Sequence, residues 1–146
     1  MYAETHSPKK ILIIEDDESL ETIFDQAIRN VEPDCQIDWA TSVEAALFNM
    51  KVAASVNGGS YDLIIADIFL EGDTTGIDFW QSCQFLYPDT PVIVTSSIGI
   101  DEFFRIIGRS AISPPFLPKP IRLGECRQLL KTLLKYSADS RLRHAA

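Results

Sequence analysis

Short apolar runs, each followed by a polar or charged residue, constrain this chain more than any other feature of its sequence. Residues 11–14 (ILII), 63–66 (LIIA) and 92–95 (VIVT) have the length and composition of strands that are buried on both faces. Between these runs, apolar residues recur at helical spacing, as they do over residues 20–31 and 77–86. Strands and helices that alternate in this way predict an α/β domain with a parallel sheet.

Two weaker runs complete the expected sheet. Apolar and polar residues alternate over residues 35–39, and a brief apolar pair at 116–117 lies among prolines. Thr41 and Glu44 form a capping-box pattern that predicts the start of another helix. Right-handed connections between parallel strands place helices on both faces, which gives three layers. The last two helices are expected over residues 100–107 and 123–134.

The length and charge of the chain limit its organisation and its partners. Its 146 residues suit one domain, which we expect over residues 10–137 between flexible ends at 1–9 and 138–146. Acidic residues outnumber basic ones by 21 to 13, and the net charge of −8 argues against nucleic-acid binding and membrane-surface binding. No run approaches the roughly 18 apolar residues of a membrane span, and the polar start is unlike a signal peptide. We therefore expect a cytoplasmic protein.

The cysteines and histidines offer little chemistry. The three cysteines are odd in number and widely separated, which suits neither a disulfide framework nor a zinc site, so we expect buried thiols. The two histidines lie near the ends of the chain. Any reaction must therefore use carboxylates, hydroxyls and lysine. The cysteines are Cys35, Cys83 and Cys126.

Polar side chains follow four of the expected strands, namely Glu15 and Asp16, Asp67, Ser96, and Lys119. Ligands of open parallel sheets bind at this carboxyl edge. If the first and third strands are neighbours, their carboxylates repel by about 4 kcal/mol at about 4 Å, and a hard cation such as magnesium would relieve that repulsion. Lysine and a hydroxyl could hold phosphate oxygens, and a carboxylate beside them could act as a nucleophile that forms an acyl phosphate.

Four motifs follow one another along the chain, namely ILIIEDD at 11–17, YDLIIADIFL at 61–70, PVIVTSS at 91–97 and FLPKP at 116–120. Together and in this order they resemble a response regulator receiver domain, and the resemblance extends from Lys10 to about Tyr136. It implies a flavodoxin-like three-layer sandwich with a five-stranded parallel sheet in the order 2-1-3-4-5 and five helices.

The resemblance also implies roles for the residues that follow the strands. Asp67 would accept a phosphoryl group from a histidine on a partner protein. Glu15 and Asp16 would be the acidic pair that holds magnesium, the cofactor of the family. Asp67 would add a carboxylate oxygen to that metal, and Phe69 would add its backbone carbonyl.

A second set of implied roles concerns the response to phosphorylation. Lys119 would contact the phosphoryl group, and the peptide bond between Lys119 and Pro120 would be cis. Ser96 would bind a phosphoryl oxygen and move toward it. Phe116 would then move inward and alter the surface formed by the helix at 100–107, the strand at 116–117 and the last helix.

The implied partners are a sensor histidine kinase or a histidine phosphotransfer protein as phosphodonor, and a downstream protein target. A homodimer through the same surface is left open, and no contact with nucleic acid or membrane is expected. The chain would not be an enzyme beyond assisted self-phosphorylation and slow autodephosphorylation. Phe69 and Ile98 flank the expected route of the attacking water, which predicts slow loss of the phosphoryl group.

Two other classes of function compete with this interpretation. A receiver-like scaffold that works without phosphorylation is the main alternative, although Asp16, Asp67 and Lys119 are all retained. A flavin protein would need a hydroxyl- and glycine-rich loop where acidic residues follow the first strand. A phosphohydrolase would need a second carboxylate two residues after its nucleophile, and Phe69 occupies that position. One departure from the family pattern is Glu71, which stands where a proline is common.

Overall fold

The strands form one parallel sheet in the order β2-β1-β3-β4-β5, which confirms the expected topology. The structure is a computed structural model that describes residues 8–55, 60–69, 75–108 and 113–144. Strand β5 lies at the edge of the sheet, where Pro118 is tolerated because no neighbouring strand needs its missing N–H. The strands are β1 (Lys10–Ile14), β2 (Gln36–Ala40), β3 (Leu63–Asp67), β4 (Val92–Ser96) and β5 (Phe116–Pro118).

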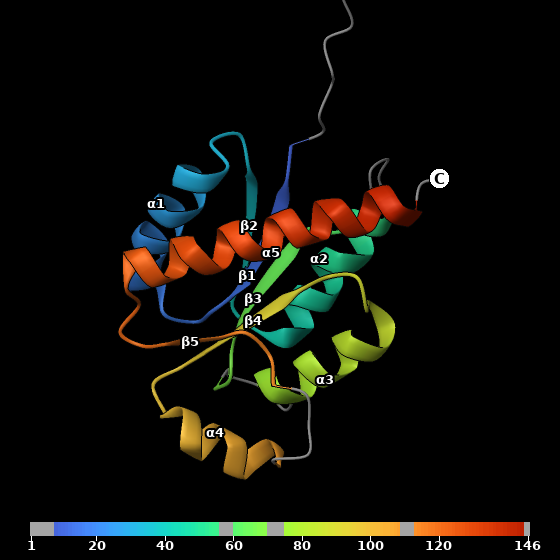
Figure 1. Cartoon of the computed structure of the whole chain (residues 1–146). Helices are drawn as coiled ribbons and strands as arrows, with labels where there is room; N and C mark the ends of the chain where they lie inside the picture. Colours follow the sequence, from blue (N-terminus) through green and yellow to red (C-terminus); the bar gives the residue numbers. More distant parts are fainter. Residues whose placement is uncertain (1–7, 56–59, 70–74, 109–112, 145–146) are drawn as a thin grey trace, which may run out of the picture.

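Helices cover both faces of the sheet, as the alternating pattern predicts. Helices α1 and α5 lie on one face, and α2, α3 and α4 lie on the other (Figure 1). A short 3-10 turn, η1 (Glu18–Leu20), leads from β1 into α1. The helices are α1 (Glu21–Val31), α2 (Val43–Ser55), α3 (Gly76–Leu86), α4 (Ile100–Ile107) and α5 (Leu123–His144).

The last helix extends into the segment that was expected to form the carboxyl-terminal tail. Helix α5 continues to His144, so residues 138–144 extend the last helix where a tail is expected. The flexibility of that segment stays a prediction. Most of the expected amino-terminal segment, residues 1–7, lies outside the described residues.

The sheet separates two apolar cores. Ile11 and Ile13 of β1 face α1 and α5, whereas Leu12 and Ile14 face the opposite layer. All four side chains are essentially inaccessible to solvent. Because successive side chains of a strand point to opposite faces, a strand between two helical layers needs apolar residues at every position. This requirement explains the continuous apolar runs in the sequence.

The start of α2 differs from the prediction. The expected capping residue was Thr41, but the structure places Ser42 at the cap, where its Oγ accepts a hydrogen bond from the Ala45 N–H at 3.1 Å. The Ser42 carbonyl also accepts from the Ala46 N–H at 3.0 Å. A capping side chain binds the N–H two or three residues later, so the helix that begins at Val43 selects Ser42.

The cysteines are buried as free thiols, as expected. Burial raises the pKa of Cys35 and of Cys83 to about 12 and that of Cys126 to about 11. The thiolate is therefore strongly disfavoured at neutral pH. Within the described ranges, none of the helices has the length and apolar character that crossing a membrane requires.

Candidate functional site

The register of the sheet brings four strand ends to one edge. Ile14 pairs with Ala66, so the residues that follow them, Glu15 and Asp67, lie at the same level of β1 and β3. Asp67 pairs in turn with Thr95 of β4. The last β4 residue, Ser96, accepts a hydrogen bond through its carbonyl from the Lys119 N–H at 2.8 Å. The backbone alone therefore aligns the polar residues that the sequence places after these strands.

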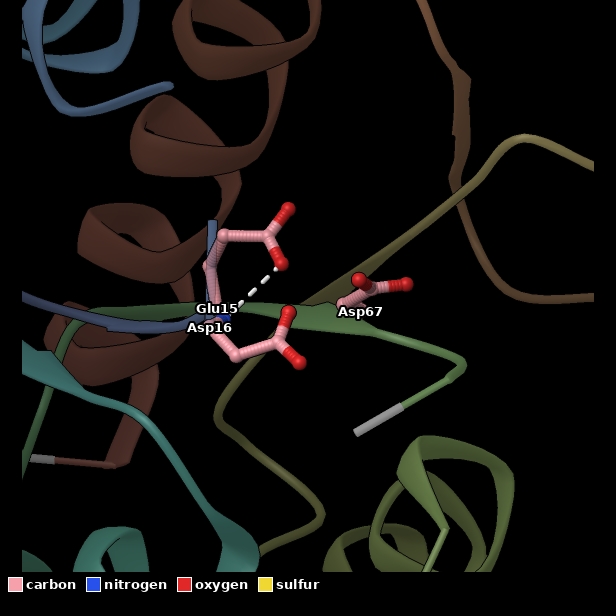
Figure 2. A group of neighbouring side chains, drawn as sticks. All are labelled: Glu15, Asp16 and Asp67. Carbon is pink, nitrogen blue, oxygen red and sulfur yellow. Dashed lines mark hydrogen bonds between the residues drawn. The ribbon is translucent and has the colours of Figure 1, made fainter. Parts of the chain in front are cut away.

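Glu15, Asp16 and Asp67 form a compact carboxylate cluster. One oxygen from each residue lies within 4.8 Å of the others. Figure 2 shows Glu15 and Asp16 at the end of β1 and Asp67 at the neighbouring end of β3. Glu15 and Asp67 are only 1% and 5% exposed, whereas Asp16 faces solvent. The Asp16 N–H donates to Glu15 Oε2 at 3.0 Å, which fixes one buried oxygen.

Lys119 supplies the counter-charge of the cluster. Its Nζ donates to Asp67 Oδ2 at 2.9 Å and also contacts Glu15 Oε1. Burial alone would lower the pKa of Lys119, but the two carboxylates raise it above its usual value, so the side chain stays charged. The Lys119–Pro120 peptide bond is cis.

The pKa of Glu15 is raised from 4.5 to about 7. Burial is the main cause, and the neighbouring Asp67 adds to it, while Lys119 acts in the opposite direction. The single Lys119 ammonium group therefore does not fully offset the negative charge of the buried carboxylates at neutral pH. A bound divalent cation would offset the remaining charge, and carboxylate oxygens are the ligands that a hard divalent cation prefers. This cluster could hold a metal ion.

Two other predicted site residues, Phe69 and Ser96, lie just after β3 and at the end of β4. The Phe69 N–H donates to Asp67 Oδ1 at 3.1 Å, so both oxygens of Asp67 have partners. The Phe69 side chain is 54% exposed. Ser96 is fully buried, and its Oγ accepts from the Ile98 N–H at 3.0 Å. A hydroxyl that accepts in this way can still donate its own hydrogen to a ligand.

Phe116 belongs to a cluster of aromatic rings that connects β5 with α4 and α3. Its ring centroid lies 5.2 Å from that of Phe103 in α4, which is fully buried. The Phe103 ring in turn lies 6.5 Å from Trp80 of α3. Any displacement of Phe116 would therefore change its contact with Phe103 and, through Phe103, the packing of α4 against α3.

Two further positions matter for the comparison with the sequence. Glu71, the residue that departs from the family pattern, lies outside the described residues. Gly76 was not predicted as a site residue, yet the structure places it directly against the backbone of Asp67 and Ile68. A glycine at the first position of a helix, shortly after a strand, is a signal for close backbone approach.

The sequence matches a known family. The family profile described as a response regulator receiver domain matches residues 11–131. The response regulator protein PilR of Pseudomonas aeruginosa is 27% identical over 131 residues. These residues cover 88% of this chain but only 27% of that relative's length.

Solved structures share the fold. The receiver domain protein (CheY-like) of Methanospirillum hungatei JF-1 matches with a TM-score of 0.70 and 18% identity, over 92% of this chain and 99% of its own. The signal receiver domain of an HD domain-containing protein from Pseudomonas fluorescens Pf-5 reaches 0.75 with 20% identity, over 97% and 98%. At these identities, the likeness shows the flavodoxin-like fold alone.

Proposed function

This chain belongs to the response regulator receiver family of two-component signalling, and from that premise we propose that it accepts a phosphoryl group on Asp67. The donor would be a phosphohistidine of a sensor histidine kinase or of a histidine phosphotransfer protein. One observation carries the proposal: the buried Asp67 carboxylate accepts a hydrogen bond from Lys119 Nζ at 2.9 Å, and one of its oxygens lies within 4.8 Å of oxygens from two further carboxylates. The same constellation is what a phosphoryl-binding site requires.

The transfer would proceed by direct displacement. A carboxylate oxygen of Asp67 attacks the phosphorus, the P–N bond of the phosphohistidine breaks, and its electron pair returns to the imidazole. The product is an acyl phosphate on Asp67. Lys119 already binds one oxygen of Asp67 and stays charged, so it is placed to contact the phosphoryl oxygens as negative charge gathers there.

Magnesium is the cation that this donor set fits. The carboxylates that would hold it are those of Glu15, Asp16 and Asp67. By resemblance to the family, Phe69 would add its backbone carbonyl. When bound, a divalent ion neutralises the clustered carboxylates and the charge of the phosphoryl group. The exposed Asp16 leaves this side of the cluster open to solvent, which suits entry of a hydrated ion.

The proposed signal would leave the site through Ser96 and Phe116. The Ser96 hydroxyl would donate to a phosphoryl oxygen, and movement of Ser96 would be accompanied by inward movement of Phe116. Because Phe116 packs on Phe103, that movement would alter the surface of α4, β5 and α5. A downstream protein would recognise this surface, and a homodimer through it is a further possibility.

The chain would act as a switch and not as an enzyme, with assisted self-phosphorylation and slow autodephosphorylation. We expect slow phosphoryl loss because Phe69 and Ile98, whose N–H groups donate to the Asp67 carboxylate and to the Ser96 hydroxyl, would flank the route of the attacking water. A cytoplasmic location is part of the proposal, and the free buried thiols are in keeping with a reducing compartment. Neither nucleic acid nor a membrane is a proposed partner.

The decisive experiment is the intact mass of the protein after incubation with magnesium and acetyl phosphate. The parent should gain one phosphoryl group, and Asp67→Asn should gain none. Asp101→Asn, an exposed acid in α4, is the matched control and should behave as the parent does. A parent that binds magnesium but gains no phosphoryl group, from acetyl phosphate or from a phosphorylated histidine phosphotransfer protein, would favour the phosphorylation-independent scaffold. A phosphoryl lifetime of only seconds would contradict slow autodephosphorylation.

A further inference from the structure

Gly76 lies in unusually close contact with the backbone of Asp67. Its N–H donates to the Ile68 carbonyl at 3.0 Å, and this bond joins the first residue of α3 to the end of β3. A Cβ atom on residue 76 would lie 1.8 Å from the Asp67 carbonyl oxygen and 2.9 Å from Ile68 Cα. Real Cβ atoms essentially never approach another heavy atom within 3.0 Å. Any side chain at this position would therefore force a displacement of more than 1 Å.

The requirement for glycine is one of space and not of backbone conformation. Gly76 does not adopt a positive φ, whereas Gly108 does, with φ of 84°. Alanine is therefore compatible with the backbone angles of Gly76, and only the contact with Asp67 and Ile68 excludes it. Glycines elsewhere do not share this restriction, since a Cβ on Gly99 or Gly124 would meet nothing within 4 Å.

Neither the end of β3 nor the start of α3 can move away from this contact without a loss of hydrogen bonding or core packing. The colliding atoms belong to the backbone, which cannot rotate aside as a side chain can. The Ile68 N–H is bonded to the Thr95 carbonyl at 3.0 Å, so the end of β3 is tied to β4. Helix α3 is anchored on the other side, because Phe79 and Trp80 are buried in the core. A side chain at residue 76 would thus push directly on the segment that holds the Asp67 carboxylate.

We propose that Gly76 is a positioning residue for phosphoryl transfer, whose missing side chain sets the place of the Asp67 carboxylate relative to Lys119. The inference rests on the proposed function of Asp67. A misplacement of about 1 Å in a reacting group costs about 100-fold in rate. We therefore expect Gly76→Ala to lower the rate of phosphorylation by acetyl phosphate about 100-fold and to weaken magnesium binding.

Two controls separate this effect from a general loss of stability. Gly124→Ala makes the same substitution where space is open. Thr75→Ala removes the cap of α3, since the Thr75 Oγ accepts from the Asp78 N–H at 3.2 Å, and so weakens the same helix start without a collision. Both controls should stay within about 2-fold of the parent rate. Cooperative thermal unfolding of each variant shows that it is folded.

The phosphorylation rates and the magnesium affinities of these variants test the inference. A folded Gly76→Ala protein that is phosphorylated as fast as the parent would overturn it, and so would an equal loss in Thr75→Ala. If the parent itself takes up no phosphoryl group, the proposed function fails, and calorimetric titration with magnesium chloride then tests the placement of Asp67. Unchanged magnesium affinity in the folded variant would overturn the inference.

A measurement on the unaltered protein covers the case in which Gly76→Ala does not fold. Because the Gly76 N–H is bonded to the residue that follows Asp67, its amide resonance should shift on addition of magnesium chloride. The amide of Gly124, in α5, should not shift. A Gly76 resonance that stays in place while the metal binds would overturn the inference.

Discussion

Glu15 should make the stability of the metal-free protein depend on pH. Burial, assisted by Asp67, raises the pKa of Glu15 from 4.5 to about 7 in the folded state. Between these two values, the folded protein holds a proton that the unfolded chain has released. The free energy of unfolding therefore falls as the pH rises through this window. The stabilisation is complete below about pH 4.5 and is lost by the time the pH passes about 7.

The size of the effect follows from the same two values. Each unit between them corresponds to about 1.4 kcal/mol, so the change from 4.5 to about 7 amounts to about 3 kcal/mol. The repulsion between the carboxylates of the cluster has a similar magnitude. Two carboxylates about 4 Å apart repel by about 4 kcal/mol at an effective dielectric constant of about 20, and Lys119 offsets part of this repulsion.

Urea denaturation of the parent and of Glu15→Gln, with a chelator present, tests the prediction. Between about pH 5 and about pH 8, the parent should lose about 2.5 kcal/mol of unfolding free energy relative to the variant. Glu44→Gln, at an exposed position in the first turn of α2, is the matched control and should keep the slope of the parent. Parallel pH profiles for the parent and Glu15→Gln would refute the reasoning. Saturating magnesium should raise the stability of the parent at the higher pH if it binds the folded state, as we propose.

Three further predictions concern the fold. Ser42→Ala should lower the free energy of unfolding by about 1 kcal/mol, and Thr41→Ala by less than about 0.5 kcal/mol, in urea denaturation; equal losses would contradict the assignment of Ser42 as the cap. Phe103→Ala removes a fully buried ring and should cost about 3–5 kcal/mol in the same assay, whereas a loss below about 1 kcal/mol would exclude Phe103 from the core. The buried thiols should resist an aromatic disulfide reagent until the protein is denatured, and rapid labelling of the native protein would show that they are accessible.

The central strands could be predicted because burial on two faces requires apolar residues at consecutive positions of the sequence. Residues 11–14 and 63–66 are apolar at every position, and both runs became buried strands. The strand ends then located the candidate site, because parallel strands with an unbroken register bring their carboxyl ends to one edge. Glu15, Asp67 and Lys119 meet there for this reason, although more than 100 residues separate the first from the last.

Details that depend on packing could not be predicted in this way. Thr41 and Ser42 are both good capping residues, and the choice between them depends on where α2 meets the sheet. The contact of Gly76 with Asp67 joins residues on either side of a loop, and it depends on how α3 is packed against the end of β3. The bond from the Ile98 N–H to Ser96 likewise depends on the local turn after β4.

The charges of the site relate the stability of the fold to the proposed acceptance of a phosphoryl group. Three carboxylates and the Lys119 ammonium leave the edge with a net charge of −2 when every acid is ionised. A divalent cation would bring this sum to zero, whereas without one burial raises the pKa of Glu15 to about 7, so that its carboxyl group holds a proton below about that pH. Conversion of the Asp67 carboxylate to an acyl phosphate would add negative charge again. Under the proposed function, the Ser96 hydroxyl, which is buried at the end of the next strand and can still donate its hydrogen, would respond to that charge.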